Sequence, residues 1–400
     1  MKRFSIFLGV FLILLVLPLV SAAHYVVGYV NDAADGEPAN GKTVVLWNPT
    51  NGINDNLTDT VGPSGSSGVD NIYLIDCELL NTPCGVGDEM RTQVFDGGDG
   101  YLSISFANIT VTGAGFDIMP NMTLNSPPSV VSVKVDDSLE SPVGEIDLTP
   151  AATTNVVCEG VVYEYDGENS LINVTAEFFD NAVSSYGSTD DNNDHYQNNS
   201  CDLNVSYGDS NDVYFNCSFQ VEYYANSGSW NCTVRAEDNP STFGYGNNLT
   251  NINSLLALSI PSPIDFGVVN VAAVGPEEQV NVTNVGNVEI NLSLSGYGAT
   301  LNDGLAMNCS LGENISEGYT KYNLTASNPG DLTLSQFESL YLNLTSNVLI
   351  RRFDLSYRHN DTAMYLDDTN FTYWRTYVPG GVLGDCSGNI VFGAVQSGGS

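Results

Sequence analysis

Short segments in which apolar and polar residues alternate recur along the whole chain. Examples are Ile172-Asn173-Val174-Thr175, Val280-Asn281-Val282-Thr283 and Ile290-Asn291-Leu292-Ser293. Successive side chains of a β-strand point to opposite faces, so this period of two sends the apolar residues inward and the polar ones into water. Runs of Gly, Asn, Asp, Ser and Pro separate the segments and are typical of turns. The pattern predicts an all-β fold.

The N-terminus predicts export. Residues 1–3 include two basic side chains, the next seventeen residues are mostly apolar, and small residues precede the peptide bond after Ala23. This order is typical of a signal peptide, which we expect over residues 1–23 with a mature chain that begins at His24. The alternative is an uncleaved anchor, the only membrane contact that the sequence favours. The rest of the chain is expected to be extracellular, at the cell surface or secreted.

The charge of the expected mature chain is strongly negative. Nine basic residues stand against 47 acidic ones, which gives a net charge of −38. Such a surface repels nucleic acid and anionic lipid, so we expect neither as a partner. Four of the nine cations are Arg351, Arg352, Arg358 and Arg375. They are expected either to pair with nearby carboxylates or to dock an acidic neighbouring subunit.

The glycosylation pattern Asn-x-Ser/Thr is unusually frequent. Several of its copies lie in the alternating segments, where the Asn and the hydroxyl residue share the wet face. We therefore predict a glycoprotein, with glycans on exposed sheet faces. The seventeen acceptors are Asn56, Asn108, Asn121, Asn173, Asn198, Asn204, Asn216, Asn231, Asn248, Asn281, Asn291, Asn308, Asn314, Asn323, Asn343, Asn360 and Asn370.

The eight cysteines predict four disulfide bonds, because their number is even and the chain is exported. Cys201 and Cys217 flank a turn centred on Asp209 and are expected as cross-strand neighbours. The other expected pairs are Cys77 with Cys84, Cys158 with Cys232, and Cys309 with Cys386. A zinc site is not expected, because the chain has no C-x-x-C pair and its three histidines are far apart in the sequence.

The domain boundaries follow from turn-rich stretches. We predict β-sandwich modules over residues 24–124, 130–240 and 255–393, joined by linkers at 125–129 and 241–254 and followed by a tail at 394–400. The first linker contains tandem Pro, which interrupts a sheet. In the third module, residues 284–287 are expected to form a hairpin turn between two alternating strands.

Two modules resemble known sandwich families. The strands His24 to Val30 and Thr43 to Trp47, joined by a polar loop, resemble the start of transthyretin-like or carboxypeptidase-regulatory-like domains. In the second module, Cys158 and Cys232, with Trp230 two residues before the second cysteine, resemble an immunoglobulin-type sandwich. The resemblance implies tandem Ig-like β-sandwich domains.

Two oxygen-rich stretches are candidate calcium loops. One contains Asp190, Asp191, Asn193 and Asp194, and the other contains Asp96 and Asp99. Clustered carboxylate and carbonyl oxygens suit a hard cation, although neither stretch has a full EF-hand ligand set. The alternatives are a solvated loop for the first stretch and a tight Asp/Gly turn for the second. His195 is expected to be exposed. Calcium is the only cofactor that the sequence favours.

A catalytic site is not predicted. Residues 36–43 match the phosphate-binding pattern G-x-x-x-x-G-K-T, but Thr43 leads into a β-branched run rather than a helix. The sequence contains no G-x-S-x-G, no H-E-x-x-H and no dinucleotide fingerprint in a βαβ context. We therefore expect a non-enzyme.

The preferred function is a structural or adhesive protein of the cell surface. The many Asn and Thr, the dense acceptors and the few Lys resemble archaeal envelope proteins of the S-layer-like or surface-filament kind. This resemblance implies partners among other envelope proteins, or self-assembly. One alternative is a secreted carbohydrate- or protein-binding module protein, for which glycans are the partners. A more remote one is a divergent secreted hydrolase.

Overall fold

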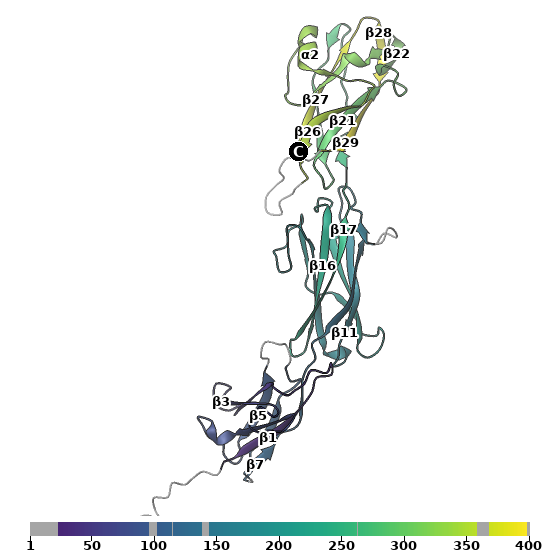
Figure 1. Ribbon diagram of the computed structural model, residues 1–400. Helices are drawn as coiled ribbons and strands as arrows, with labels where there is room; N and C mark the ends of the chain where they lie inside the picture. Colours follow the sequence, from purple (N-terminus) through teal and green to yellow (C-terminus); the bar gives the residue numbers. More distant parts are fainter. Residues whose placement is uncertain are drawn as a thin grey trace, which may run out of the picture.

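The computed structural model describes residues 23–95, 102–113, 115–137, 144–261, 263–357 and 368–397. Their strands form seven sheets, and the sheets enclose apolar cores that belong to separate stretches of sequence. The predicted all-β class is confirmed, in the form of tandem β-sandwiches. Figure 1 shows three modules that follow one another end to end and give the molecule an elongated shape.

The first module is a sandwich of two four-stranded sheets. One has the order β4-β1-β7 with β8 also on β1, and the other has the order β3-β2-β5-β6. Its elements are β1 (Tyr25–Asn31), β2 (Thr43–Trp47), β3 (Asn56–Thr60), β4 (Ile72–Asp76), η1 (Cys77–Leu79), β5 (Glu89–Phe95), β6 (Ala107–Thr110), β7 (Phe116–Ile118) and β8 (Met122–Thr123).

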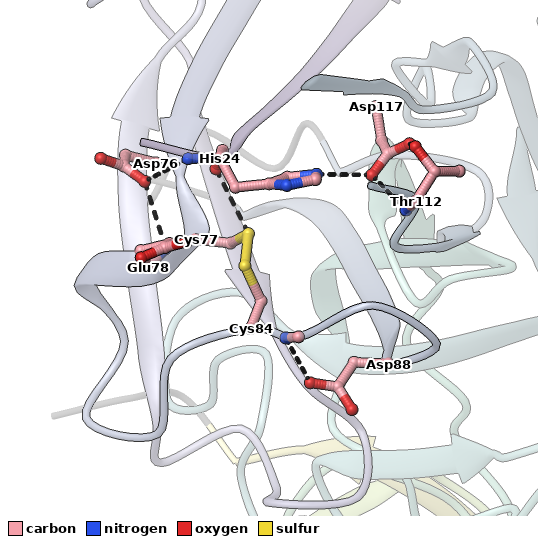
Figure 2. Close-up of a disulfide and its surroundings, with 9 residues drawn as sticks. His24, Asp76, Cys77, Glu78, Cys84, Asp88, Thr112 and Asp117 are labelled. Atoms are coloured by element: carbon pink, nitrogen blue, oxygen red, sulfur yellow. Dashed lines mark hydrogen bonds and ion pairs between the residues drawn. A yellow bond between two sulfur atoms is a disulfide. The ribbon is translucent and has the colours of Figure 1, made fainter. Parts of the chain in front are cut away.

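The start of the first module is fastened by His24 and a short-range disulfide (Figure 2). The His24 side chain is buried and its Nε2 lies 2.7 Å from Asp117 Oδ2. The backbone N–H of Cys77 donates to the His24 carbonyl, and Cys77 is bonded to Cys84. Burial raises the pKa of Asp117, but hydrogen bonds from Thr112 and the contact with His24 outweigh that effect and lower it. The first described residues are therefore held in place.

The second module pairs a five-stranded sheet, β10-β17-β16-β12-β13, with a four-stranded sheet, β14-β15-β11-β9. Long strands dominate it: five of them have ten or more residues, and each contributes side chains to the same core. Its elements are β9 (Ser129–Asp137), β10 (Glu145–Ile146), β11 (Thr154–Tyr163), η2 (Glu168–Ser170), β12 (Leu171–Asp180), β13 (His195–Asn198), β14 (Asp202–Asn204), β15 (Asp212–Val221), β16 (Gly228–Asp238) and β17 (Phe243–Ile252).

Two disulfides cross the core of the second module. Cys158 on β11 is bonded to Cys232 on β16, which joins the two sheets. Cys217 lies directly opposite Cys158 across β11 and β15, and it is bonded to Cys201 with a Cα separation of 4.5 Å. Trp230 is fully buried in the same core. These are the predicted pairs, and the predicted cross-strand geometry of Cys201 and Cys217 is confirmed.

The predicted linker at residues 241–254 is wrong, because most of it is strand β17. This strand pairs with β16 along its whole length, from Phe243 opposite Glu237 to Ile252 opposite Gly228. Its glycines permit close packing against β9, since a Cβ on Gly244 would lie 1.8 Å from the Pro128 carbonyl oxygen. The glycines of this stretch therefore reflect a close approach of the two sheets and not a flexible connection.

The third module contains a six-stranded sheet, β18-β20-β27-β24-β25 with β19 also on β27, and two three-stranded sheets, β26-β21-β29 and β23-β22-β28. Its disulfide joins Cys309 on β22 to Cys386, directly opposite on β28, which is the predicted pair. Its elements are β18 (Leu258–Ser259), β19 (Ala273–Val274), β20 (Glu278–Asn284), β21 (Ile290–Tyr297), β22 (Leu305–Gly312), β23 (Ile315–Ser316), η3 (Glu317–Tyr319), β24 (Thr320–Asn323), α2 (Leu334–Leu340), β25 (Leu342–Asn343), β26 (Leu349–Leu355), β27 (Thr369–Val378), β28 (Val382–Ser387) and β29 (Asn389–Gln396).

The predicted hairpin at residues 284–287 is also wrong, because β20 and β21 belong to different sheets. The connection crosses between the sheets, and the fully buried Asn284 secures it by donating to the carbonyls of Val288 and Leu355. The same segment joins the second and third modules. Asn287 Oδ1 accepts from the backbone of Leu255, and its Nδ2 donates to the Asn253 carbonyl.

Candidate functional site

The segment between the first and second modules is buried and polar. Leu124 belongs to the apolar core of the first module, and the next two residues, Asn125 and Ser126, are fully buried against acidic side chains of the second module. The Asn125 amide donates to Asp238 Oδ2 over 2.7 Å, and the Ser126 N–H donates to Asp166 Oδ2 over 2.7 Å. The connection between these modules is therefore a built contact and not a loose tether.

Three carboxylates converge at this junction. Glu164 and Asp166 follow the end of β11, and Asp238 is the last residue of β16. One oxygen from each lies within 4.8 Å of the other two. Glu164 and Asp238 are fully buried, and Asp166 is partly exposed. This junction cluster, Glu164 with Asp166 and Asp238, is the one group of three potential metal ligands among the described residues.

The electrostatics of the junction cluster oppose full ionisation. Burial raises the pKa of Glu164 to about 7, and the charges of Asp238 and Asp166 add to the rise. Burial also raises the pKa of Asp166, together with the charges of Asp238 and Asp35. Within the described part of the chain, no Lys, Arg or His forms an ion pair with any of the three carboxylates. Three carboxyl groups thus share one partly dry site without a protein cation, so that ionisation of all three is unfavourable.

Two buried oxygens of the junction accept no hydrogen bond. They are Oε2 of Glu164 and Oδ1 of Asn125. The other atoms nearby are satisfied: Asp238 Oδ1 accepts from the N–H and the hydroxyl of Thr242, and Glu164 Oε1 accepts from the Asp166 N–H. A buried polar atom without a partner is costly. The site therefore offers carboxylate and amide oxygens, the donor type that a hard divalent cation takes.

The candidate calcium loop of the second module is organised by its own hydrogen bonds. Asp191 Oδ1 accepts from the backbone and side-chain nitrogens of Asn193, and Asp190 Oδ1 accepts from the Gln197 N–H. The Asp194 N–H donates to the Asp191 carbonyl. Calcium at this loop stays a prediction. Asp96 and Asp99, the second candidate, lie outside the described residues.

His195 is fully buried, so the expectation of an exposed residue is wrong. Its ring stacks on Phe179 at 5.5 Å between centroids. The Ser184 hydroxyl lies 2.9 Å from its Nδ1, and Glu177 Oε2 lies 3.3 Å from its Nε2. A serine, histidine and carboxylate in this order are the parts of a nucleophile relay. The side-chain contacts with Glu177 and Phe179, and the Ser184 N–H that donates to the Asp180 carbonyl, join this loop to β12.

The described glycosylation acceptors are exposed or partly exposed, although the Oδ1 atom of Asn231 is buried. None of the sixteen described Asn side chains is buried, and ten are exposed, including Asn281 on β20. Asn360 lies outside the described residues. Neighbouring apolar residues such as Val280 and Val282 point into the core. The predicted division between a wet and a dry face is therefore present on β20, as an oligosaccharide requires, but it is wrong for Ile172, Leu203 and Val205, whose side chains are exposed.

The remaining sequence candidates have structural roles. Lys42 of the phosphate-loop pattern is buried and lies 2.9 Å from Glu37 Oε1, and Thr43 begins β2. Arg375 is also buried, with 1% exposure, so it does not face a neighbouring subunit and that hypothesis is wrong for it. Arg352 pairs with Asp354, and Arg358 lies outside the described residues.

A cleft of about 830 Å³ lies in the third module. It is lined by residues of 260–271 and of β22, β27, β28 and β29, with Ile260, Val269, Ile315 and Phe392 among the apolar ones. Its lining is a mixture of polar and apolar atoms. No ionisable cluster of the described residues lies in it, because the one such group is at the other end of the second module.

The junction cluster was missed in the sequence because its members are far apart along the chain. Glu164 and Asp238 each lie six residues after a cysteine of the Cys158–Cys232 bond. If both strands run in the same direction away from that bond, their ends must meet. That spacing is the signal by which the cluster could have been found.

Comparisons with known proteins identify no family. Neither a protein-family model nor a curated protein matches the sequence. Among solved structures, the chain is similar to the major pilin BcpA of Bacillus cereus, at a TM-score of 0.29 and 9% identity over 69% of this chain and 77% of that one. It is similar to the major pilin SpaD of Corynebacterium diphtheriae, at a TM-score of 0.25 and 10% identity over 71% of this chain and 77% of that one. It is also similar to the C-terminal domain of the Streptococcus agalactiae polypeptide BspA, at a TM-score of 0.20 and 10% identity over 68% of this chain and 100% of that one.

These likenesses are too low to transfer a function. In the part of the chain that the structure describes, no helix is both long and apolar enough to span a bilayer.

Proposed function

We propose that the protein is an extracellular structural or adhesive component of a cell surface, which spans distance with a chain of stacked sandwiches. The observation that carries the proposal is the junction between modules. Both described connections are buried or hydrogen-bonded, through Asn125 and Ser126 at one end and Asn287 at the other. Modules joined in this way keep their relative direction, which a rod or filament needs and an isolated binding domain does not.

The covalent and surface chemistry supports an extracellular setting. Each module contains at least one disulfide, and no cysteine is free. Disulfides persist in oxidising compartments. The acidic, acceptor-rich surface resists nonspecific association, so assembly would proceed through specific faces. We propose the class of archaeal S-layer-like or surface-filament proteins, because the chain has many Asn and Thr, dense glycosylation acceptors and few Lys.

The N-terminus fits removal of a signal peptide before His24. The His24 nitrogen lies 3.3 Å from Asp76 Oδ1 (Figure 2). In a chain cleaved at that bond the nitrogen would be an ammonium group beside a carboxylate, a favourable pairing at a fixed end. N-terminal sequencing of the protein from its own cells tests this proposal, which predicts His24 as the first residue.

Assembly distinguishes the proposed function from its main alternative. Electron microscopy of the purified native protein is expected to show fibres or ordered arrays. Binding to a glycan array by protein that stays monomeric would favour the carbohydrate-binding alternative. Turnover of a polysaccharide or peptide would favour the remote hydrolase alternative.

Glycosylation gives a prediction for single residues. Asn281→Gln is expected to remove one glycan from protein made in its own cells, because Asn281 is exposed beside Thr283 on β20. The mass of the intact protein should fall by one oligosaccharide. Asn347→Gln is the matched control, since Asn347 is exposed but lacks the acceptor pattern. Equal masses for the wild-type chain and the Asn281 variant, after allowing for the amino-acid change, would contradict the prediction.

A further inference from the structure

We propose that the junction cluster of Glu164, Asp166 and Asp238 is a calcium site that locks the first module onto the second. The site does not depend on the proposed function. One oxygen of each carboxylate lies within 4.8 Å of the others. A single ion can therefore contact all three after small side-chain adjustments, because calcium binds oxygen at about 2.3–2.6 Å.

Unpartnered buried atoms point to a ligand, beyond the acidity of the cluster. Glu164 is fully buried, yet its Oε2 accepts no hydrogen bond. Asn125 is fully buried as well, and its Oδ1 has no partner although its Nδ2 contacts Asp238. A buried carboxylate oxygen without a donor or a countercharge is costly, even though the other oxygen of Glu164 accepts from the Asp166 N–H. A bound cation would remove both the missing contact and the repulsion.

The donor set selects calcium among common metals. All available atoms are oxygens, so zinc and copper, which favour nitrogen and sulfur, are poor matches. The carboxylate oxygens come from two separate segments, after β11 and at the end of β16, and the connection between the modules contacts them through Asn125 Nδ2 and Asp238. Calcium tolerates irregular sets of six to eight oxygens, whereas magnesium requires a near-ideal octahedron. The partly exposed Asp166 leaves one side open to water ligands.

The connection between modules is bonded to the proposed ligands themselves. Ser126 donates its N–H to Asp166, and Asn125 donates its amide to Asp238. The Asp35 N–H, from a loop of the first module, donates to the Ser126 hydroxyl. Fixing the two carboxylates with an ion therefore fixes the segment that leaves the first module. The inferred role is a calcium-dependent stiffening of this joint.

Calorimetric titration of the chelated full-length secreted chain with CaCl₂ tests the site. We expect wild type to bind a calcium ion at the junction with an affinity that Glu164→Gln lowers by at least about tenfold, since a charged ligand is lost. Asp238→Asn is expected to act in the same direction. Asp209→Asn, in an exposed turn of the same module, is the matched control and should bind as wild type. MgCl₂ is expected to bind more weakly than CaCl₂.

Thermal unfolding in the presence of a chelator checks the folding of the variant separately. There the unfolding temperature of Glu164→Gln should equal or exceed that of wild type, because the substitution removes a buried acidic group beside two others. Calcium should then raise the unfolding temperature of wild type only. No calcium binding by wild type, unchanged binding by the Glu164 variant, or tighter magnesium binding would overturn the proposal. Loss of calcium binding in Asp190→Asn, together with unchanged calcium binding in Glu164→Gln, would also overturn it, because the ion would then lie in the loop at 188–195.

Small-angle X-ray scattering tests the stiffening. Calcium is expected to narrow the distribution of interatomic distances for wild type and to leave that of Glu164→Gln unchanged. Identical wild-type curves with calcium and with chelator, despite measured binding, would overturn the locking role.

Discussion

Arg375→Met is expected to lower the free energy of unfolding of the third module by about 3–5 kcal/mol, the cost of breaking a buried charged network. The Arg375 guanidinium is 1% exposed and donates to the carbonyls of Gly275, Asn328 and Gly330 at 2.7–2.8 Å. Methionine would leave three carbonyls without this donor. Urea unfolding followed by the fluorescence of Trp374 measures the effect, because Trp374 is fully buried in that core, provided that Trp47 and Trp230 are replaced by Phe in all the chains compared.

A tyrosine connects this arginine to a carboxylate. Arg375 Nε donates to the Tyr341 hydroxyl, which in turn donates to Glu277. Burial raises the pKa of Glu277, but its hydrogen bonds and the charge of Arg375 outweigh that effect and lower it. Arg352→Met is the matched control, since that side chain is 86% exposed, and it should change stability by less than about 0.5 kcal/mol. Similar losses for both variants would contradict the assignment.

Removing the Cys158–Cys232 bond, by Ala at both positions, is expected to cost the second module about 4 kcal/mol. The bond closes a loop with a sequence separation of 74 and joins the two sheets. Without it the unfolded chain gains conformational freedom. Trp230 reports on this module because it is fully buried in its core, provided that Trp47 and Trp374 are replaced by Phe in all the chains compared.

The second disulfide of the same core is the internal control. Cys201 and Cys217 are separated by only 16 positions, so Ala at both is expected to cost about 3 kcal/mol. The order of the two losses is the informative result. A larger loss for the short loop would mean that the Cys158–Cys232 bond does not constrain the unfolded chain as its length requires.

The period of two was enough to predict individual strands, because it follows from local geometry. Ile290 to Ser293 is strand as expected, and so is the stretch from Val280 to Thr283. Which strands pair was harder to predict. Two consecutive alternating segments are compatible with a hairpin in one sheet and also with strands in two facing sheets. The buried Asn284 favours the second arrangement, because its side chain donates to the carbonyls of Val288 and of Leu355 on the distant strand β26. Likewise, Gly244 looked like a linker residue until its packing against Pro128 was visible.

The cysteines gave long-range information that the strands lacked. Each predicted pair is present, because an even number of cysteines per module left few alternatives. The calcium candidates in the sequence were chosen by local density of oxygens, as at Asp190 and Asp191. The junction cluster has no such density, since Glu164 and Asp238 meet only after the sandwich forms. A site whose residues come from two strands can be predicted from the sequence only when the register of both strands is known.

Immunogold labelling of intact source cells is the most direct measurement of the central claim, that this chain is a building element outside the cell. Antibodies against each of the three modules should decorate the outer surface of unpermeabilised cells, in rows or along filaments. Label that appears only after permeabilisation would contradict the account.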